Sequence, residues 1–198
     1  MSISKIHSPK LIFTCACLGM LLFGISLITL GSVAAPLREK FQLDAMASGT
    51  LFSILPIGIL AGSLFFGPFS DRYGYKIILL MSCFFIFAGF QGIAFAPSLL
   101  LLKVCIFLFG FGGGAINGAT NAVVADISET NKGANLSLLG VFFAVGALGM
   151  PFVLGALEAR FSFEEIVSVI GYIPLLAGVL YLLTLFQAPK QVQGVPLV

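Results

Sequence analysis

The chain alternates between long apolar runs without any charged residue and short polar breaks. An ionised side chain at the centre of a bilayer costs about 2.5–3.5 kcal/mol, and a helix needs about 20 residues to cross. Charge-free runs of that length therefore predict transmembrane helices. We expect six of them, at residues 11–35, 46–69, 76–96, 98–125, 133–157 and 166–188. Lys103 lies in the first turns of the fourth, from where its side chain can reach the lipid–water boundary.

The composition is that of a membrane protein, and it argues against several classes of function. Hydrophobic residues make up 59% of the chain and charged residues 9%, whereas soluble domains have about 25% charged residues. The small net charge of +2 gives no reason to expect a nucleic-acid partner. Four cysteines fall inside apolar runs, where we expect buried thiols: Cys15, Cys17, Cys83 and Cys105. The sequence has no evident metal-ligand cluster, nucleophile–base pair or nucleotide-binding loop, so we expect no metal, no cofactor and no enzyme activity.

The distribution of glycine indicates an internal repeat. Glycine and small polar residues are concentrated in spans one, two, four and five, whereas spans three and six are more uniformly apolar. Folding the sequence at residue 97 superposes these patterns, and Gly62 in the second span then corresponds to Gly146 in the fifth. Two units with an odd number of spans must be inverted relative to each other, which is typical of secondary transporters. We therefore expect an all-α membrane protein built from two inverted three-helix repeats.

Lysine and arginine residues between the spans indicate the orientation. With the N-terminus inside, the cytoplasmic side carries Lys5, Lys10, Arg72, Lys76, Lys132 and Lys190, and the outer side carries Arg38, Lys40, Lys103 and Arg160. This bias places both termini in the cytoplasm and the bundle in the inner or plasma membrane. We expect a cytoplasmic tail at residues 1–10, the bundle at 11–188, and the beginning of a central cytoplasmic loop at 189–198.

One charged stretch joins the second and third spans, and its fixed residues are Gly67, Asp71, Arg72, Gly74 and Lys76. We expect close helix approach at Gly67, a tight turn at Gly74, and Asp71 facing a helix N-terminus. Arg72 and Lys76 should contact the anionic inner surface of the membrane. The pattern Gly-x-x-x-Asp-Arg-x-Gly-x-Lys resembles the signature motif of the major facilitator superfamily, which lies at this place in the N-terminal half. The resemblance implies a latch that clips one half of a transporter to the other, and an ordinary positively charged loop is the alternative.

A second resemblance covers the fourth and fifth spans. Residues 117–121 and 133–147 are similar to the fucose/glucose permease branch of the same superfamily. Proton-coupled members of this branch carry acidic residues at the positions that match Ser32 and Asn117. Neither residue is ionisable here, so the sequence does not support proton coupling through those positions. The resemblance implies a sugar-like solute.

Four polar residues are candidates for the solute path. Asn117 and Asn121 lie one helical turn apart and share a helix face. Together with Thr29 and Ser32 of the first span, they could line a cavity for a neutral polyhydroxylated solute. The asparagines could equally hydrogen-bond neighbouring helices, because an amide in hydrocarbon needs a partner.

Two further polar side chains have simpler interpretations. We expect Gln91 to satisfy its amide locally within the third span. Asp126, at the end of the fourth span, either pairs with Arg72 or remains a solvated loop charge.

The superfamily fold has twelve spans in two halves with the solute path between them. The resemblance therefore implies that this chain supplies an N-terminal half, whose partner is a missing C-terminal half, a separate chain or a second copy. The expected function is secondary transport of a small neutral polar solute, in particular a sugar, by alternating access. A non-transporting fragment or a structural membrane protein is the alternative.

Overall fold

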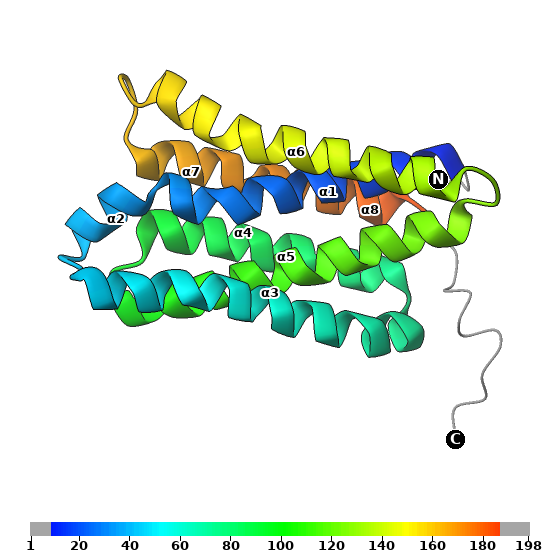
Figure 1. Cartoon of the computed structure of the whole chain (residues 1–198), viewed down its shortest axis with the longest axis horizontal. Coiled ribbons are helices and arrows are strands. Elements are labelled where there is room, and N and C mark those ends of the chain that lie inside the picture. The colour runs from blue at the N-terminus through cyan, green and yellow to red at the C-terminus, as the bar shows by residue number, and fades with distance from the viewer. Residues whose placement is uncertain (1–8, 187–198) are drawn as a thin grey trace, which may run out of the picture.

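The computed structural model describes residues 9–186, and nearly all of them are helical (Figure 1). The helices are α1 (Pro9–Ser32), α2 (Ala34–Lys40), α3 (Ala45–Tyr73), α4 (Tyr75–Phe95), α5 (Leu99–Ile127), α6 (Lys132–Leu157), α7 (Phe163–Gly171) and α8 (Ile173–Leu183). In this part of the chain, 6 helical segments are long and apolar enough to cross a membrane, with α7 and α8 together forming the last. The expected all-α bundle is confirmed.

The first and last spans differ from the prediction. The first helix ends at Ser32, and a separate short helix, α2, then carries Pro36 and the charged residues before the second span. The last span begins earlier than expected and is interrupted at Tyr172, two residues before Pro174. Proline lacks a backbone N–H and clashes with the preceding turn, which accounts for the break. The expected central loop and most of the expected cytoplasmic tail lie outside residues 9–186.

Polar residues in the short breaks begin several of the helices. The carboxylate of Asp44 accepts a hydrogen bond of 2.7 Å from the backbone N–H of Ala47, at the beginning of α3. Ser98 similarly caps α5, and Ser162 forms a reciprocal capping box with Glu165 at the beginning of α7. These side chains satisfy backbone donors that have no partner within the helix. The polar breaks in the sequence are therefore helix start signals as well as interfacial segments.

Two glycine-mediated crossings hold the membrane helices together. Gly24 of α1 and Gly146 of α6 face each other so closely that a Cβ atom on either would lie within 3.0 Å of the other helix's backbone. Gly62 of α3 and Gly114 of α5 make the same kind of contact with the other helix. Small residues allow such backbone contact in membranes. The two crossings correspond under the expected repeat, because Gly62 and Gly146 occupy equivalent positions.

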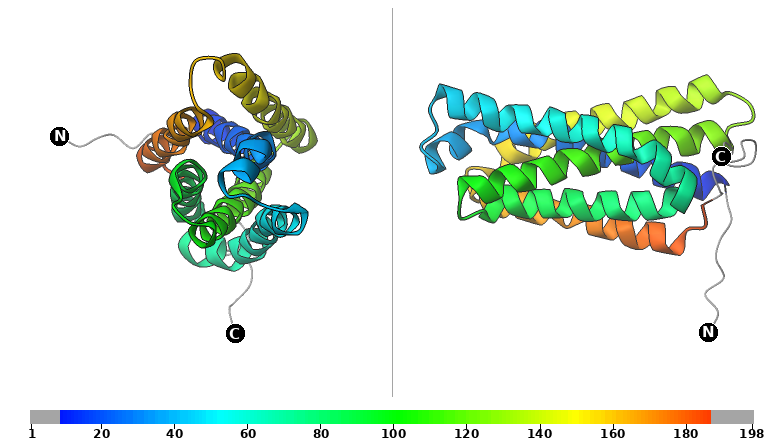
Figure 2. Two further views of the ribbon diagram at one scale, coloured as in Figure 1. Left: turned by 90° about the vertical axis from the view of Figure 1, so that its left-hand side faces the viewer. Right: turned by 90° about the horizontal axis from the view of Figure 1, so that it is seen from below.

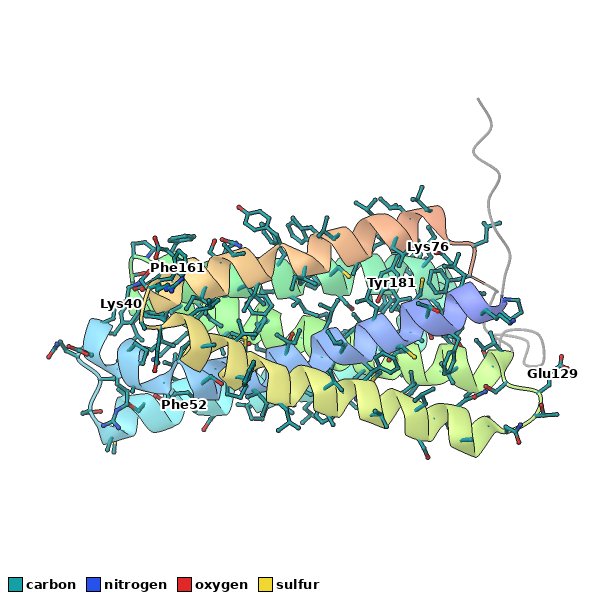
Figure 3. All side chains as sticks on the ribbon, turned by 90° about the horizontal axis from the view of Figure 1, so that it is seen from above. Lys40, Phe52, Lys76, Glu129, Phe161 and Tyr181 are labelled. Carbon is teal, nitrogen blue, oxygen red and sulfur yellow. The ribbon has the colours of Figure 1, made fainter. Side chains whose placement is uncertain are left out.

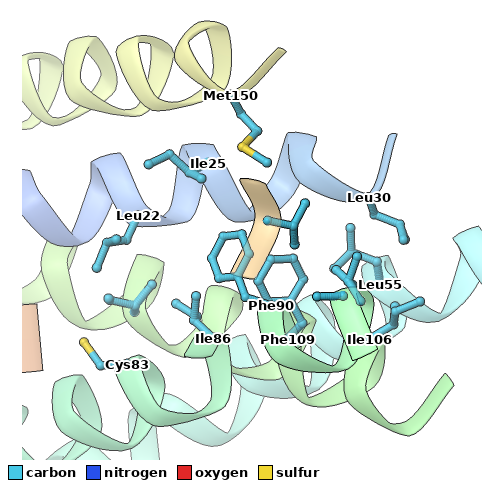
Figure 4. Packing of buried hydrophobic residues seen from close by; sticks show 14 of the residues in the cluster. Leu22, Ile25, Leu30, Leu55, Cys83, Ile86, Phe90, Ile106, Phe109 and Met150 are labelled. Atoms are coloured by element: carbon cyan, nitrogen blue, oxygen red, sulfur yellow. The ribbon is translucent and has the colours of Figure 1, made fainter. Parts of the chain in front are cut away.

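The hydrophobic core brings together side chains from α1, α3, α4 and α5, with Met150 of α6 beside them (Figure 4). The rings of Phe90 and Phe109 pack edge to face with their centroids 4.9 Å apart. Gly89 makes this possible, because a Cβ atom there would collide with the ring of Phe109. Edge-to-face packing is favourable for aromatic rings, and it fixes α4 against α5 at the centre of the bundle.

Polar contacts join α4 to the last span. The amide of Gln91 donates to the carbonyl oxygen of Ser168 at 3.1 Å, and the hydroxyl of Ser168 donates back to the Gln91 side chain at 3.0 Å. The expectation that Gln91 satisfies its amide locally is therefore wrong. An amide in hydrocarbon gains more from a partner on a neighbouring helix when its own helix offers no free acceptor.

The helices α3 and α6 lie at the edges of the bundle, as the end-on view shows (Figure 2). Only 22% of the most apolar window of each is buried, compared with 56% for α1 and 50% for α5. The window of α4 is also 56% buried, so α1, α4 and α5 form the interior, and α3 and α6 each leave one long side uncovered by residues 9–186.

Candidate functional site

The charged stretch between α3 and α4 is more helical than expected. Helix α3 continues through Gly67, Asp71 and Arg72 as far as Tyr73, and α4 begins at Tyr75. Only Gly74 leaves the helical conformation, with a φ of 79° that residues with a Cβ atom rarely adopt. The turn expected at Gly74 is thus present, but it is a single residue long. The motif is a rigid helical corner rather than a flexible loop.

Asp71 projects from this corner beside a pocket of about 410 Å³. The pocket is lined by Phe66, Gly67, Ser70, Asp71, Tyr75, Ala122, Ala125, Asp126 and Lys132. Within residues 9–186 the Asp71 carboxylate has no hydrogen-bond or ion-pair partner. Gly67 has no neighbour within 4 Å of the place a Cβ atom would take, so the close approach expected there does not occur inside this bundle. Both residues remain available to a partner outside it.

The other side of the pocket contains a partly buried hydrogen bond. The hydroxyl of Tyr75 donates to Asp126 Oδ2 at 2.7 Å, which ties the beginning of α4 to the end of α5. Asp126 therefore pairs with Tyr75, and Arg72 instead lies over the ring of Tyr73, with its guanidinium carbon 5.4 Å from the ring centroid. The pairing of Asp126 with Arg72, one of two expectations, is not found.

Lys76 has a different contact from the one expected. Within the bundle, its ammonium group donates to the backbone carbonyl oxygens of Leu182 and Thr184, at the end of α8. A cation at a helix C-terminus interacts favourably with the exposed carbonyls. Lys76 thereby joins the motif to the last span.

Lys40 makes an equivalent contact at the opposite end of the bundle (Figure 3). Its ammonium group donates to the carbonyl of Ala94 at 3.0 Å and to the carboxylate of Glu164 at 3.2 Å. Sequence reasoning placed Lys40 on the outer side but missed its contact with Glu164. Lys76 and Lys40 thus each link α4 to the last span, at opposite ends of the bundle.

The asparagine pair lies in the interior of the bundle and is half-buried. The side-chain N–H₂ of Asn121 donates to the Asn117 side chain at 3.0 Å and to the Asn117 backbone carbonyl at 2.9 Å. The same group lies 3.8 Å from the sulfur of Met20 on α1. The side-chain N–H₂ of Asn117 donates no hydrogen bond within residues 9–186. It is the group of this pair that a solute could use.

Thr29 and Ser32 do not join the asparagines. Thr29 is fully buried and its hydroxyl donates to the carbonyl of Ile25 at 2.7 Å, while Ser32 donates to Ile28 at 3.0 Å. Thr29 stands nine residues beyond Met20 on α1, which corresponds to about 13 Å along the helix axis. Thr29 and Ser32 therefore lie at a different depth of the bundle from the side chains that Asn121 contacts.

The profile of the Major Facilitator Superfamily matches residues 16–196 of the sequence. The chain belongs to the major facilitator superfamily. The six-helix bundle is therefore that of the expected family.

Similar proteins are transporters rather than enzymes. The chain is 26% identical to a D-xylose transporter of Levilactobacillus brevis over 132 residues, which cover 67% of the chain and 29% of the relative. It is 32% identical to a 4-hydroxybenzoate transporter of Acinetobacter baylyi, over 84% of the chain and 36% of the relative. It thus spans only about a third of the length of these relatives.

Solved structures give the same fold. The partially occluded, inward-open conformation of the xylose transporter of Escherichia coli matches with a TM-score of 0.82 at 17% identity, over 91% of the chain and 50% of that structure. The bundle thus corresponds to half of a superfamily fold.

Proposed function

We propose that the chain is one half of a secondary transporter that works against a second six-helix bundle. The observation that carries this proposal is the family membership, combined with the uncovered sides of α3 and α6. The partner would be a continuation of the polypeptide, a separate chain or a second copy. The two bundles would rock against each other around a site at the middle of the membrane.

Open glycine positions support such a partner. On α3, Gly49 and Gly67 lie on one side of the helix, and neither has a neighbour within 4 Å of an added Cβ atom. On α6, Gly140 and Gly155 are equally open. Positions of this kind accept a closely packed helix in the membrane. Asp71 stands at the end of the open side of α3, where its carboxylate would meet a helix N-terminus of the second bundle.

The solute that we propose is small, neutral and polyhydroxylated, in particular a sugar. Neither the run 11–37 nor the run 104–125 contains Asp, Glu, Lys, Arg or His, so α1 and the middle of α5 offer no charge at mid-membrane depth. An anionic solute would need a cationic partner there, because buried charges are costly unless paired. The free side-chain N–H₂ of Asn117 suits a hydroxyl oxygen. These features favour a sugar over 4-hydroxybenzoate, the cargo named for one relative.

In the proposed orientation, the motif corner lies on the cytoplasmic side of the cell membrane. Helix α1 begins and α8 ends at the same end of the bundle, which is also the end at which α3 passes into α4 (Figure 1). Arg72, Lys76 and Lys132 lie at this end, as the excess of positive charge on the cytoplasmic side requires.

Uptake by proteoliposomes containing the full chain tests the proposal, with radiolabelled D-xylose, D-glucose and 4-hydroxybenzoate offered separately. We expect sugar uptake above that of empty liposomes, and a loss of at least fivefold on Asn117→Ala, since an unpaired buried polar group costs about 1–3 kcal/mol. Asn135→Ala, which removes an asparagine near the loop before α6, is the matched control and should leave uptake unchanged. Uptake of 4-hydroxybenzoate alone would refute the sugar, and uptake of none would favour the non-transporting alternative.

A further inference from the structure

A groove of about 270 Å³ opens between α3 and α4, with α5 as its floor. Its lining is almost entirely aromatic and aliphatic, and comprises Gly62, Phe65, Phe66, Phe69, Ile78, Met81, Ser82, Phe85, Phe111 and Ala115. The rings of Phe65 and Phe85 both contact Phe111, with centroids 6.0 and 5.6 Å away. A polar solute would find nothing to bind here, whereas a hydrocarbon chain fits this lining.

The groove leads to a positive charge at the end of α3. Phe65, Phe69 and Arg72 are spaced four and three residues apart, so they share one side of the helix. The rings of Phe65, Phe69 and Tyr73 follow one another, with successive centroids 6.4 and 5.6 Å apart. The guanidinium of Arg72 lies over the last ring, at 5.4 Å. An aromatic track therefore runs from the membrane interior to a cation at its boundary.

Arg72 is free to bind an anion. It is exposed, and no carboxylate lies within ion-pair distance of it in residues 9–186. Asp71, its neighbour in sequence, stands two residues from Phe69 and therefore almost opposite it on the helix, where it lines the other pocket. The negative charge of Asp71 is thus directed away from the groove.

The same geometry separates the groove from the side proposed for the second bundle. Gly67 is two residues from Phe65 and Phe69, so the open glycine positions lie almost opposite the aromatic track. On α4, the exposed residues beside the groove are Ile77, Met81 and Phe84, which are apolar. This side of the molecule therefore has the composition of a surface in contact with lipid.

We propose that the groove binds an anionic phospholipid of the adjacent leaflet, with an acyl chain along Phe65, Phe69 and Phe85 and the phosphate on Arg72. Arginine suits a phosphate because its planar guanidinium can donate two parallel hydrogen bonds. The proposal does not depend on solute transport, since lipid occupancy can be measured without a solute.

Tryptophan fluorescence tests the proposal directly, because the chain contains no tryptophan. Met81 lines the groove and is 42% exposed, so Met81→Trp places a single fluorophore at its mouth without burying new volume. The protein is reconstituted in phosphatidylcholine vesicles, and brominated phosphatidylglycerol or brominated phosphatidylcholine is added as the quencher. Leu176→Trp is the control, because Leu176 lies on α8, away from the open sides of α3 and α6, and is 70% exposed.

We expect brominated phosphatidylglycerol to quench Met81→Trp at about fivefold lower concentration than brominated phosphatidylcholine, as one arginine near the anionic headgroup would give. Adding Arg72→Gln should remove the preference, whereas Arg38→Gln, at the other end of the bundle, should leave it intact. Leu176→Trp should be quenched equally by both lipids. Equal quenching of Met81→Trp, no quenching of it, or a preference that survives Arg72→Gln would each overturn the proposal.

Discussion

The hydroxyl of Tyr75 donates a 2.7 Å hydrogen bond to Asp126, and this contact joins the corner after α3 to the end of α5. Hydrogen bonds to charged groups contribute about 1.5–3 kcal/mol. Tyr75→Phe should therefore lower the free energy of unfolding by about 1–2 kcal/mol, because Tyr75 is only 6% exposed and Asp126 would lose a donor. Tyr73→Phe is the matched control, since the described part of the chain shows only ring contacts for Tyr73. Unfolding in mixed micelles with increasing SDS measures both, and equal midpoints would show that the bond is not stabilising.

The two glycine crossings give a second prediction. Gly146→Ala would place a methyl group against the backbone of α1 at Leu21, which cannot move without displacing the helix. Overpacking of this kind costs about 1–3 kcal/mol. Gly140→Ala, on the open side of the same helix, should instead be neutral or stabilise by up to about 1 kcal/mol through helix propensity. In the same SDS titration, the unfolding midpoint should fall for Gly146→Ala and stay the same or rise for Gly140→Ala. Equal destabilisation of the two variants would contradict the assigned packing.

The membrane spans were predictable because they depend on local composition. The correspondence between Gly62 and Gly146 was predictable because it follows from the repeat in the sequence. The turn at Gly74 was equally predictable, because glycine readily adopts the positive φ that such a turn needs. The partners of Gln91 and Lys76 were not predictable, because both lie on the last span and depend on how helices distant in sequence come together. The depth of Thr29 relative to the asparagines was not predictable either, because it depends on the register between α1 and the antiparallel helix α5.

The cation at the end of α8 leads to a third prediction. Lys76→Met removes the donors that satisfy the carbonyls of Leu182 and Thr184. The end of α8 should then open more often, at a cost of about 1 kcal/mol. Hydrogen–deuterium exchange should become about fivefold faster in a peptide containing residues 180–184 and remain unchanged in α5. Lys132→Met, which removes an exposed lysine beside the motif pocket, provides the control, and accelerated exchange in that variant would assign the effect to net charge.

Two buried serines should respond in opposite ways to the same substitution. Ser82 is 1% exposed and its hydroxyl has no hydrogen-bond partner in residues 9–186, so Ser82→Ala should be neutral or stabilise by up to about 1 kcal/mol. Ser168 exchanges hydrogen bonds with Gln91, so Ser168→Ala should destabilise by about 0.6 kcal/mol, the typical value for such bonds between membrane helices. Thermal unfolding in a mild detergent compares them. A destabilising Ser82→Ala would mean that its hydroxyl has a partner.

The open sides of α3 and α6 predict where a second bundle is contacted. Gly67→Cys or Gly140→Cys, labelled in native membranes with a maleimide–benzophenone reagent and then illuminated, should form a cross-linked product, because neither position has a neighbour within this bundle and benzophenone bonds to C–H groups of a contacting helix. Cys105→Ala is a suitable background, since Cys105 is the one partly exposed cysteine of the chain. Leu176→Cys is the control: Leu176 is 70% exposed on α8, away from both glycine positions, and should react with the reagent without forming a product.

A product at twice the mass of the chain would identify a second copy, and another mass would identify a separate half. Products from Leu176→Cys as abundant as those from Gly67→Cys would mean that the contacts are collisional, and the partner surface proposed for α3 and α6 would be lost.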